Sequence, residues 1–248
     1  MAASGVWSEQ EVAGHTCDVF EPAVAHGQGF VIVYLHGADQ QRLAAQPAFA
    51  TELDRHGLRV IGPRTGRSWW TDKIYSQFDP QVSAERYVLD RVVPDIAERW
   101  GIRSPAIGLL GTGMGGQGAL RLALKHPRLF PVVAALSPAI DYYQQWYEEE
   151  SLAAMYPDAE GARQDTATLH VHPLNWPRNL WFACDPADPL WYNGADRLRM
   201  KLAALGIPFE CDLETSAGGN RSAYDRQQAP KAVGFLVERL EAESRRVV

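Results

Sequence analysis

One short segment limits the possible folds of this chain more than any other. Residues 106–110 form an apolar run, and the next six positions, 111–116, contain four glycines. Residues 114–125 then have the composition of a helix. The segment therefore predicts a strand that ends in a sharp turn and continues directly as a helix, as in α/β sheets.

Strand-like and helix-like segments alternate through most of the chain, which predicts an α/β domain with a largely parallel sheet. Residues 30–35 (FVIVYL) are continuously apolar, which is typical of a central strand covered on both faces. Pro94 lies inside an expected helix, where it either kinks the helix or begins its second half. We expect strands at 30–35, 58–61, 106–110, 131–136, 180–184 and 209–213, and helices at 47–56, 84–100, 114–125, 195–205 and 229–243.

The strand pattern stops between Ile140 and Pro177, in a stretch that is acidic and aromatic. We expect this stretch to form a short helical cap or an excursion over the sheet edge. No repeat, low-complexity segment or linker interrupts the sequence. The sequence therefore predicts one domain over residues 1–248, with a cap-like excursion at 140–177.

Composition excludes several classes of protein. A formal charge of -6 argues against a nucleic-acid partner, and no apolar run reaches the roughly 18 residues of a membrane helix. The first ten residues lack the basic and apolar regions of a secretory signal, so we expect a cytoplasmic protein. Cys17, Cys184 and Cys211 are too few and too scattered for a disulfide framework or a zinc site.

The glycine turn has the frame of a nucleophile elbow, G-x-S-x-G, in which a serine is raised above the sheet. Here Gly113 occupies the serine position. Glycine has no hydroxyl, so acyl-enzyme chemistry cannot begin at this residue. Glycine does adopt the positive φ of such a turn without the strain of other residues, so we expect the turn to keep its shape.

A catalytic triad on this kind of fold runs in the chain order nucleophile, acid, histidine. Two candidate acids, Asp185 and Asp188, follow the expected strand 180–184. The segment after the last expected strand, residues 215–220 (TSAGGN), contains no histidine. The seven histidines all lie earlier in the chain: His15, His26, His36, His56, His126, His170 and His172.

Several motifs together resemble the esterase D group of α/β-hydrolases, which includes the S-formylglutathione hydrolases, over nearly the whole chain. They are YLHG at 34–37, SWWTD at 68–72, GTGMGGQGAL at 111–120, DPAD at 185–188, WY at 191–192 and GG at 218–219. The resemblance implies an α/β-hydrolase fold, with a mostly parallel sheet of about eight strands and helices on both faces.

The resemblance also implies where the catalytic residues of the group would fall. The nucleophile falls on Gly113, the acid on Asp188 and the histidine on Asn220, so two of the three are substituted. The choice of Asp188 over Asp185 rests on the resemblance. Arg221 and Ser222 depart from the small and aromatic residues that usually follow the histidine.

The oxyanion hole of such an enzyme uses backbone N–H groups, which a substituted side chain does not remove. Its expected donors here are the N–H of Met114 and an N–H of the loop at Gly37 and Ala38. The binding part of the site is therefore expected to persist.

Four aromatic residues are candidate pocket walls. Trp69 and Trp70 follow an expected strand, with Trp191 and Tyr192 on the opposite rim. The alternative for the adjacent tryptophans is local packing, with their indole N–H groups satisfied nearby.

Other residues offer weaker catalytic candidates. Thr112 and Ser137 carry hydroxyls near the elbow, and Asp39 lies in the loop after a central strand. His170 and His172 have strand-like spacing, but without carboxylate ligands beside them a surface or packing role is favoured over a metal. We expect no metal and no cofactor.

The sequence thus predicts an esterase-like pseudoenzyme, which keeps the fold of a serine carboxylesterase and binds a small acyl or ester-like ligand. An alternative remains open: an active carboxylic-ester or thioester hydrolase that uses a non-standard nucleophile.

Overall fold

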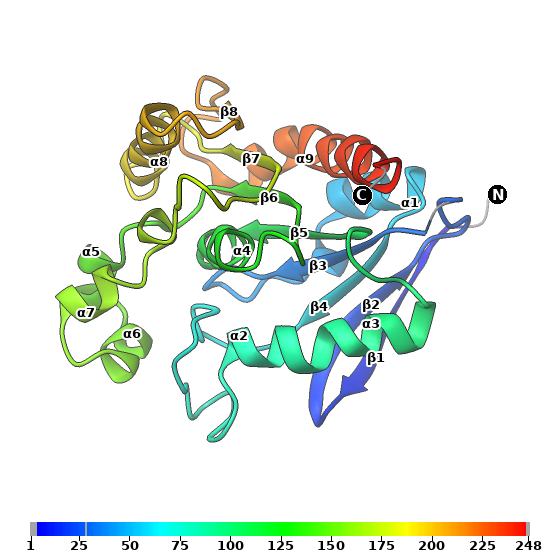
Figure 1. Ribbon diagram of the computed structural model, residues 1–248, viewed down its shortest axis with the longest axis horizontal. Coiled ribbons are helices and arrows are strands. Elements are labelled where there is room, and N and C mark those ends of the chain that lie inside the picture. Colours follow the sequence, from blue (N-terminus) through cyan, green and yellow to red (C-terminus); the bar gives the residue numbers. More distant parts are fainter. Residues whose placement is uncertain (1–3, 28, 247–248) are drawn as a thin grey trace.

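Eight strands form one sheet in the order β1-β2-β4-β3-β5-β6-β7-β8 in the computed structural model, which describes residues 4–27 and 29–246 (Figure 1). The strands are β1 (Val6–Val12), β2 (His15–Glu21), β3 (Val31–Leu35), β4 (Arg59–Pro63), β5 (Ile107–Thr112), β6 (Val132–Leu136), β7 (Asn179–Ala183) and β8 (Glu210–Asp212).

The six strands from β3 to β8 pair in parallel, which confirms the predicted α/β class and the six strands expected from the sequence. The hairpin of β1 and β2, which pairs antiparallel with β4, was not among them. β1 (VWSEQEV) lies at the edge of the sheet and is largely exposed and polar, so it lacks the apolar run that marks a central strand.

Helices cover both faces of the sheet (Figure 1). One core lies between the sheet and the helices α1 (Pro47–Arg55) and α9 (Arg221–Ser244). The other core lies under the remaining main helices: α2 (Ala84–Tyr87), the π-helical turn η2 (Val88–Val92), α3 (Val93–Trp100), α4 (Met114–Lys125) and α8 (Tyr192–Ala204). Alternate residues of β3 point into opposite cores, as the pleat of a doubly covered strand requires.

Two predicted helix starts were wrong. α9 begins at Arg221 rather than at residue 229, because Asn220 caps it and Pro230 lies within the helix. α8 begins at Tyr192 rather than at 195. The expected helix 84–100 is continuous, and Pro94 is the second residue of α3, directly after the π-helical turn η2, where the hydrogen-bond pattern of the helix changes.

Residues between β6 and β7 form short helices that pack on the α4 side of the sheet: α5 (Tyr142–Glu148), α6 (Glu150–Met155), α7 (Ala159–Arg163) and the 3-10 turn η3 (Ala167–Leu169). A further 3-10 turn, η1 (Leu43–Ala45), precedes α1. Within the described residues, no helix has the length and apolar character needed to cross a membrane.

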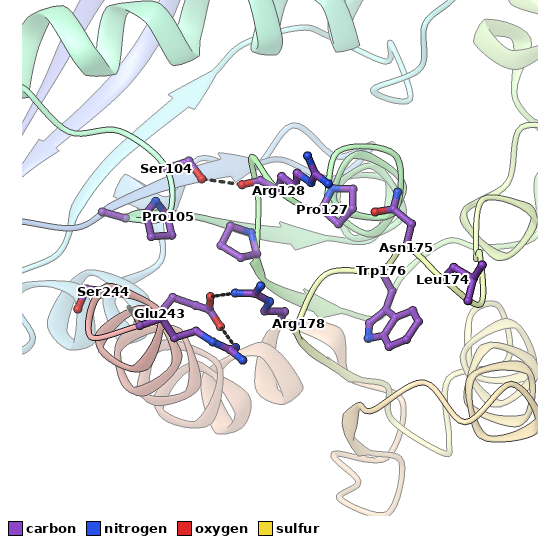
Figure 2. Close-up of a pocket in the computed structure, with 13 residues that line it drawn as sticks. Ser104, Pro105, Pro127, Arg128, Leu174, Asn175, Trp176, Arg178, Glu243 and Ser244 are labelled. Atoms are coloured by element: carbon purple, nitrogen blue, oxygen red, sulfur yellow. Dashed lines mark hydrogen bonds and ion pairs between the residues drawn. The ribbon is translucent and has the colours of Figure 1, made fainter. Parts of the chain in front are cut away.

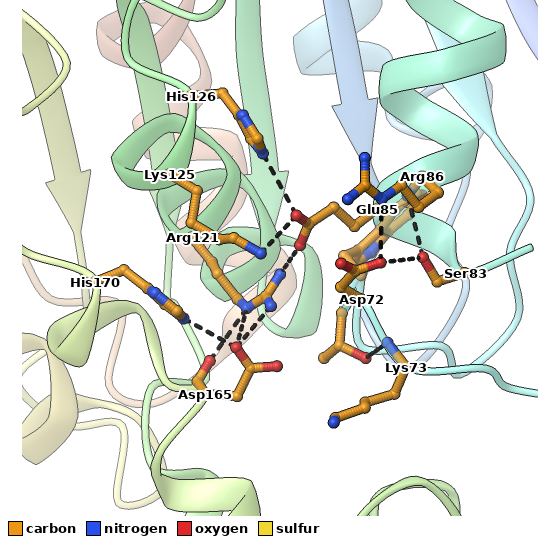
Figure 3. Close-up of polar contacts among 12 residues, drawn as sticks. Asp72, Lys73, Ser83, Glu85, Arg86, Arg121, Lys125, His126, Asp165 and His170 are labelled. Atoms are coloured by element: carbon orange, nitrogen blue, oxygen red, sulfur yellow. Dashed lines mark hydrogen bonds and ion pairs between the residues drawn. The ribbon is translucent and has the colours of Figure 1, made fainter.

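A buried ion cluster joins this excursion to the main domain (Figure 3). The Arg121 side chain of α4 is 1% exposed and pairs with two carboxylates, Glu85 of α2 and Asp165 after α7, the latter at 2.6 Å. The ring of His170 lies 2.9 Å from the same Asp165 carboxylate. The excursion is therefore held against α4 by charge pairing as well as by apolar contacts.

Candidate functional site

Gly113 lies at the turn between β5 and α4, and its backbone has the geometry of a nucleophile elbow. Its φ and ψ are 55° and -116°, a region that residues with a side chain rarely adopt. Gly113 N donates to Leu136 O, and Gly113 O accepts from Ala139 N, so the turn is hydrogen-bonded to the neighbouring strand β6 and the loop after it.

The surrounding glycines are required by close backbone contacts. A Cβ on Gly111 would lie 2.0 Å from Gly115 O, and a Cβ on Gly115 would lie 1.8 Å from Leu35 O. Gly113 differs, because a Cβ there would meet only the Cα of Gly37, at 3.9 Å. The position therefore has room for a side chain, although its backbone conformation disfavours one.

The backbone N–H groups of Met114, at the start of α4, and of Ala38, in the loop after β3, have no hydrogen-bond acceptor among the residues that the structure describes. The first N–H groups of a helix have no partner within it and favour negative charge. Gly37 is the neighbour of Gly113 across this turn, and its carbonyl accepts from Gln40 N and from the His36 ring. We call Gly37, Ala38, Gly113 and Met114 the elbow site.

The two candidate acids have different surroundings. The Asp185 carboxylate accepts hydrogen bonds from Ser216 Oγ at 2.7 Å, Ala217 N at 2.8 Å and Gly219 N at 3.0 Å. Burial opposes its charge, but these bonds lower the pKa of Asp185 to about 2. Asp185 therefore fixes the loop after β8 against the loop after β7.

Asp188 lies in the loop between β7 and α8, where its Oδ1 accepts from Leu190 N and Trp191 N. Its other oxygen lies 3.9 Å from the Arg221 guanidinium. The same guanidinium lies over the Trp191 ring, 5.8 Å from its centre. Arg221 is thus the cationic neighbour of the carboxylate that the resemblance makes the acid.

The Asn220 side chain is committed to a helix end. Its Oδ1 accepts from Ala223 N at 3.0 Å, which caps α9. An amide side chain in this position satisfies an otherwise unpaired N–H group of the first turn.

Each of the seven histidines has a polar partner other than Asp188, Asn220 and Arg221. His36 is the one next to the elbow site, and it is buried, with Nδ1 donating to Gly37 O and Nε2 accepting from Thr65 N. Burial lowers its pKa. His172 Nδ1 accepts from Leu174 N, and the others pair with carboxylates: His15 with Asp79, His26 with Glu241, His56 with Glu52, His126 with Glu85 and His170 with Asp165.

The two hydroxyl candidates also have other partners. Thr112 Oγ1 lies 3.1 Å from the Tyr34 hydroxyl. Ser137 is buried, with a positive φ of 42°, and its side chain interacts with the Cys184 thiol. Burial raises the pKa of that thiol to about 12.

The adjacent tryptophans lie in the core, at 1% and 0% exposure. Trp69 Nε1 donates to Ser151 Oγ, and Trp70 Nε1 donates to His36 O. Local packing, the alternative to pocket walls, accounts for these contacts. Trp191 is buried as well, and Tyr192 lines a hollow of about 730 Å³ beside β8.

Asp225 of α9 is a residue that sequence reasoning missed. Its Oδ1 is buried with no hydrogen-bond partner among the described residues. Burial raises its pKa to about 7; Arg221 opposes this shift, while Asp39 and Asp188 add to it. Because the predicted helix began at residue 229, the spacing of Arg221 and Asp225 on one helix face went unnoticed.

A hollow of about 910 Å³ lies at the opposite end of the sheet (Figure 2). It is lined by residues that precede β5, β6 and β7, among them Pro105, Pro131 and Arg178. Gly113 follows the other end of β5, about 20 Å away along the six-residue strand. This hollow is therefore separate from the elbow site. No group of three or more His, Cys, Asp or Glu side chains in the described part of the chain could hold a metal ion.

Comparison with known proteins identifies the family of the chain. A family described as "Putative esterase" matches residues 18–204. No curated protein matches the chain.

Solved structures match over almost the whole chain. The fluorophosphonate-binding serine hydrolase FphF of Staphylococcus aureus is 17% identical, with a TM-score of 0.75 over 95% of this chain and 99% of its own. An S-formylglutathione hydrolase of Agrobacterium tumefaciens is 16% identical, with a TM-score of 0.75 over 97% of both chains. The S-formylglutathione hydrolase FrmB of S. aureus is 16% identical, with a TM-score of 0.69 over 94% of this chain and 98% of its own. The likeness shows the α/β-hydrolase fold.

Proposed function

The chain belongs to the esterase family that matches it, and from that premise we propose that it binds a small ester or acyl ligand at the elbow site without hydrolysing it. The observation that carries the proposal is the elbow itself. The turn at Gly113 has the backbone of a nucleophile elbow, and the residue at its tip has no side chain.

The chemistry that is lost supports this proposal. Gly113 offers no attacking oxygen, and an amide at Asn220 cannot take up a proton near neutral pH. In a well-studied serine protease, loss of the serine or the histidine alone costs about 10⁶-fold in kcat. The charge beside Asp188 is now an arginine, which is no proton acceptor.

The binding elements that remain also support it. The N–H groups of Ala38 and Met114 can donate to a carbonyl oxygen, as the donors of an oxyanion hole do. A Cβ at Gly113 would meet only Gly37, which leaves room for part of a ligand where a nucleophile would stand.

Hydrolysis of p-nitrophenyl acetate tests the proposal. We expect the wild-type protein to give no turnover above a heat-denatured control. The double change Gly113→Ser with Asn220→His restores the two missing groups, and we expect it to give measurable esterase activity. Either change alone should do little, because the serine and the histidine act as a unit.

Wild-type turnover above the denatured control would contradict the proposal. Its loss in Thr112→Ala or Ser137→Ala would then identify the nucleophile and establish the alternative of an active hydrolase. A folded double variant without activity would contradict the part of the proposal that keeps the oxyanion donors in place.

A further inference from the structure

We propose that the hollow of about 910 Å³ in Figure 2 is a second binding site, which takes an organic anion with an apolar body. We call it the amino-end hollow, because its lining residues include those that precede β5, β6 and β7. The elbow site follows the other end of β5. This second site therefore does not depend on the ligand proposed for the elbow site.

The walls of the amino-end hollow are partly rigid and apolar. Three prolines line it: Pro105, Pro127 and Pro131. A proline ring fixes φ and provides no N–H group, so these walls have little backbone freedom to lose when a ligand enters. Sites for small molecules occupy about 300–1,000 Å³, and the amino-end hollow falls within that range.

An exposed leucine and a half-buried tryptophan extend the apolar wall. Leu174 is 85% exposed, although the turn that carries it is fixed: Asn175 N donates to His172 O, and Leu174 N donates to the His172 ring. Trp176 packs against the core on one side and lines the hollow on the other. A ligand with an apolar body would cover part of this exposed surface, which favours binding.

The charged residues that line the hollow are mostly cationic: Arg128, Arg178 and Arg246 against Glu243. The Glu243 side chain is 4% exposed and lies 3.1 Å from both the Arg178 and the Arg246 guanidinium, so two cations share one carboxylate. Arg128 is exposed, and its side chain has no ion pair in the described part of the chain. Figure 2 shows it beside Ser104, apart from Arg178 and Glu243.

These side chains leave a local excess of two positive charges on a chain whose formal charge is -6. The carboxyl ends of α4 and α9 lie next to the hollow, and each contributes a partial negative charge of about half a unit. Their sum does not cancel the excess, so an anion is attracted and a cation is repelled. Together with the apolar walls, this charge describes a carboxylate or sulfonate on an aromatic or aliphatic body.

Two fluorescent compounds with the same aromatic frame test the inference. One is 8-anilinonaphthalene-1-sulfonate, an anion, and the other is N-phenyl-1-naphthylamine, which lacks the sulfonate. Fluorescence titration measures the affinity of the wild-type protein for each. We expect both to bind, and we expect added salt to weaken the binding of the sulfonate alone, because salt screens its attraction to exposed arginines.

Arg128→Gln tests the cation that has no protein partner. We expect it to weaken the binding of the sulfonate at least about threefold and to leave the affinity for the neutral amine unchanged. Arg226→Gln is the matched control, because Arg226 is exposed on α9 but lies 17 residues before Glu243, about 26 Å along the helix. The control should change neither affinity.

Leu174→Ser tests the apolar wall. We expect it to weaken the binding of both compounds at least about threefold, because both lose the same apolar contact. Val6→Ser is the control: Val6 is 66% exposed on β1, at the far edge of the sheet from β7. Circular dichroism of each variant checks that it is folded.

Several outcomes would overturn the proposal. If the wild-type protein binds no sulfonate, or if Arg128→Gln weakens both compounds equally, the hollow does not select an anion. If Leu174→Ser changes neither affinity, the compounds bind elsewhere. If the wild-type protein is a dimer in size-exclusion chromatography that Leu174→Ser makes monomeric, without a change in sulfonate binding, the hollow is an interface between two copies of the chain. None of these outcomes bears on the elbow site.

Discussion

Arg221 Nη2 lies 3.9 Å from Asp188 Oδ2, in the corner where the related esterases are expected to hold a histidine beside their acid. The neighbouring residue, Asn220, instead caps the helix that Arg221 begins. A helix cap and an ion pair are thus adjacent here, at the two residues on which the resemblance places a histidine and its acid.

We predict that Arg221→Ala raises the kcat of the Gly113→Ser/Asn220→His variant by about tenfold, the effect of one pKa unit on the new imidazole. The guanidinium competes for Asp188 and destabilises a neighbouring imidazolium. Steady-state hydrolysis of p-nitrophenyl acetate measures the change. Arg226→Ala, an exposed arginine of the same helix, is the control and should leave kcat unchanged.

The Asn220 cap predicts a stability effect that is independent of any chemistry. Asn220→Ala should lower the free energy of unfolding by about 1 kcal/mol, because the Ala223 N–H loses its acceptor. Asn220→Asp keeps an acceptor and should cost little. Urea denaturation measures both, and equal losses for the two variants would mean that the cap contributes nothing.

A side chain at Gly113 should be costly through the backbone alone. Gly113→Ala is expected to lower the free energy of unfolding by about 1–3 kcal/mol, the cost of holding an ordinary residue in such a conformation. Gly101→Ala is the comparison, because Gly101 has the milder left-handed conformation of φ 69° and ψ 11°. A Cβ on Gly101 would meet nothing within 4 Å. A smaller loss at Gly113 than at Gly101 would refute the strain argument.

The buried cluster in Figure 3 predicts a large effect of removing its cation. Arg121→Met should lower the free energy of unfolding by about 3–5 kcal/mol, because Glu85 and Asp165 stay buried without their partner. Arg163→Met removes a solvent-exposed pair with Glu160 and should have little effect on the free energy of unfolding. Similar losses in the two variants would show that burial of the cluster is unimportant.

The same cluster predicts how stability depends on acid. Burial opposes the charge of Glu85, but the His126 hydrogen bond, the Arg121 charge and the Lys125 contact lower its pKa to about 2. Because the pKa of Glu85 is lower in the folded than in the unfolded protein, the ionised carboxylate stabilises the fold above the unfolded pKa. This contribution is lost as the pH falls toward about 2. Glu85→Gln should therefore be less stable than the wild type near neutral pH, with a difference that narrows on acidification. Thermal denaturation across this range measures it.

The raised pKa of Asp225 predicts that this residue affects stability in the opposite direction to Glu85 as the pH changes. Its folded pKa is raised to about 7, so the ionised carboxyl destabilises the fold increasingly as the pH rises from its ordinary value of 3.8 to about 7. Asp225→Asn removes this penalty, and we expect the variant to gain stability over the wild type through that range. A constant difference between the two proteins would show that Asp225 does not titrate there.

Much of the fold could be predicted because its signals are local. The apolar run of β3 and the glycine turn after β5 depend on residues that are close in the sequence. The parallel pairing of six strands followed from their alternation with helices. The edge strand β1 could not be recognised, because its exposed polar residues carry no such pattern.

The partners of Asp185 and Asp188 could not be predicted in the same way. Asp185 and Asp188 are three positions apart and look alike in the sequence, but the first fixes the loop after β8 and the second faces Arg221. Arg221 and Asp225 were unassigned because the start of α9 was placed eight residues too late. Asp188, which faces Arg221, comes from the loop after β7, which is distant in the chain.

The sequence by itself determined the class of the fold and the absence of a serine at residue 113, since both are read from residue identity and short-range periodicity. Only the tertiary structure decided which charges face one another: Arg221 against Asp188, and Arg121 against Glu85 and Asp165. Electrostatic interaction depends on distance and burial, and both are set when separate strands deliver their loops to one edge of the sheet.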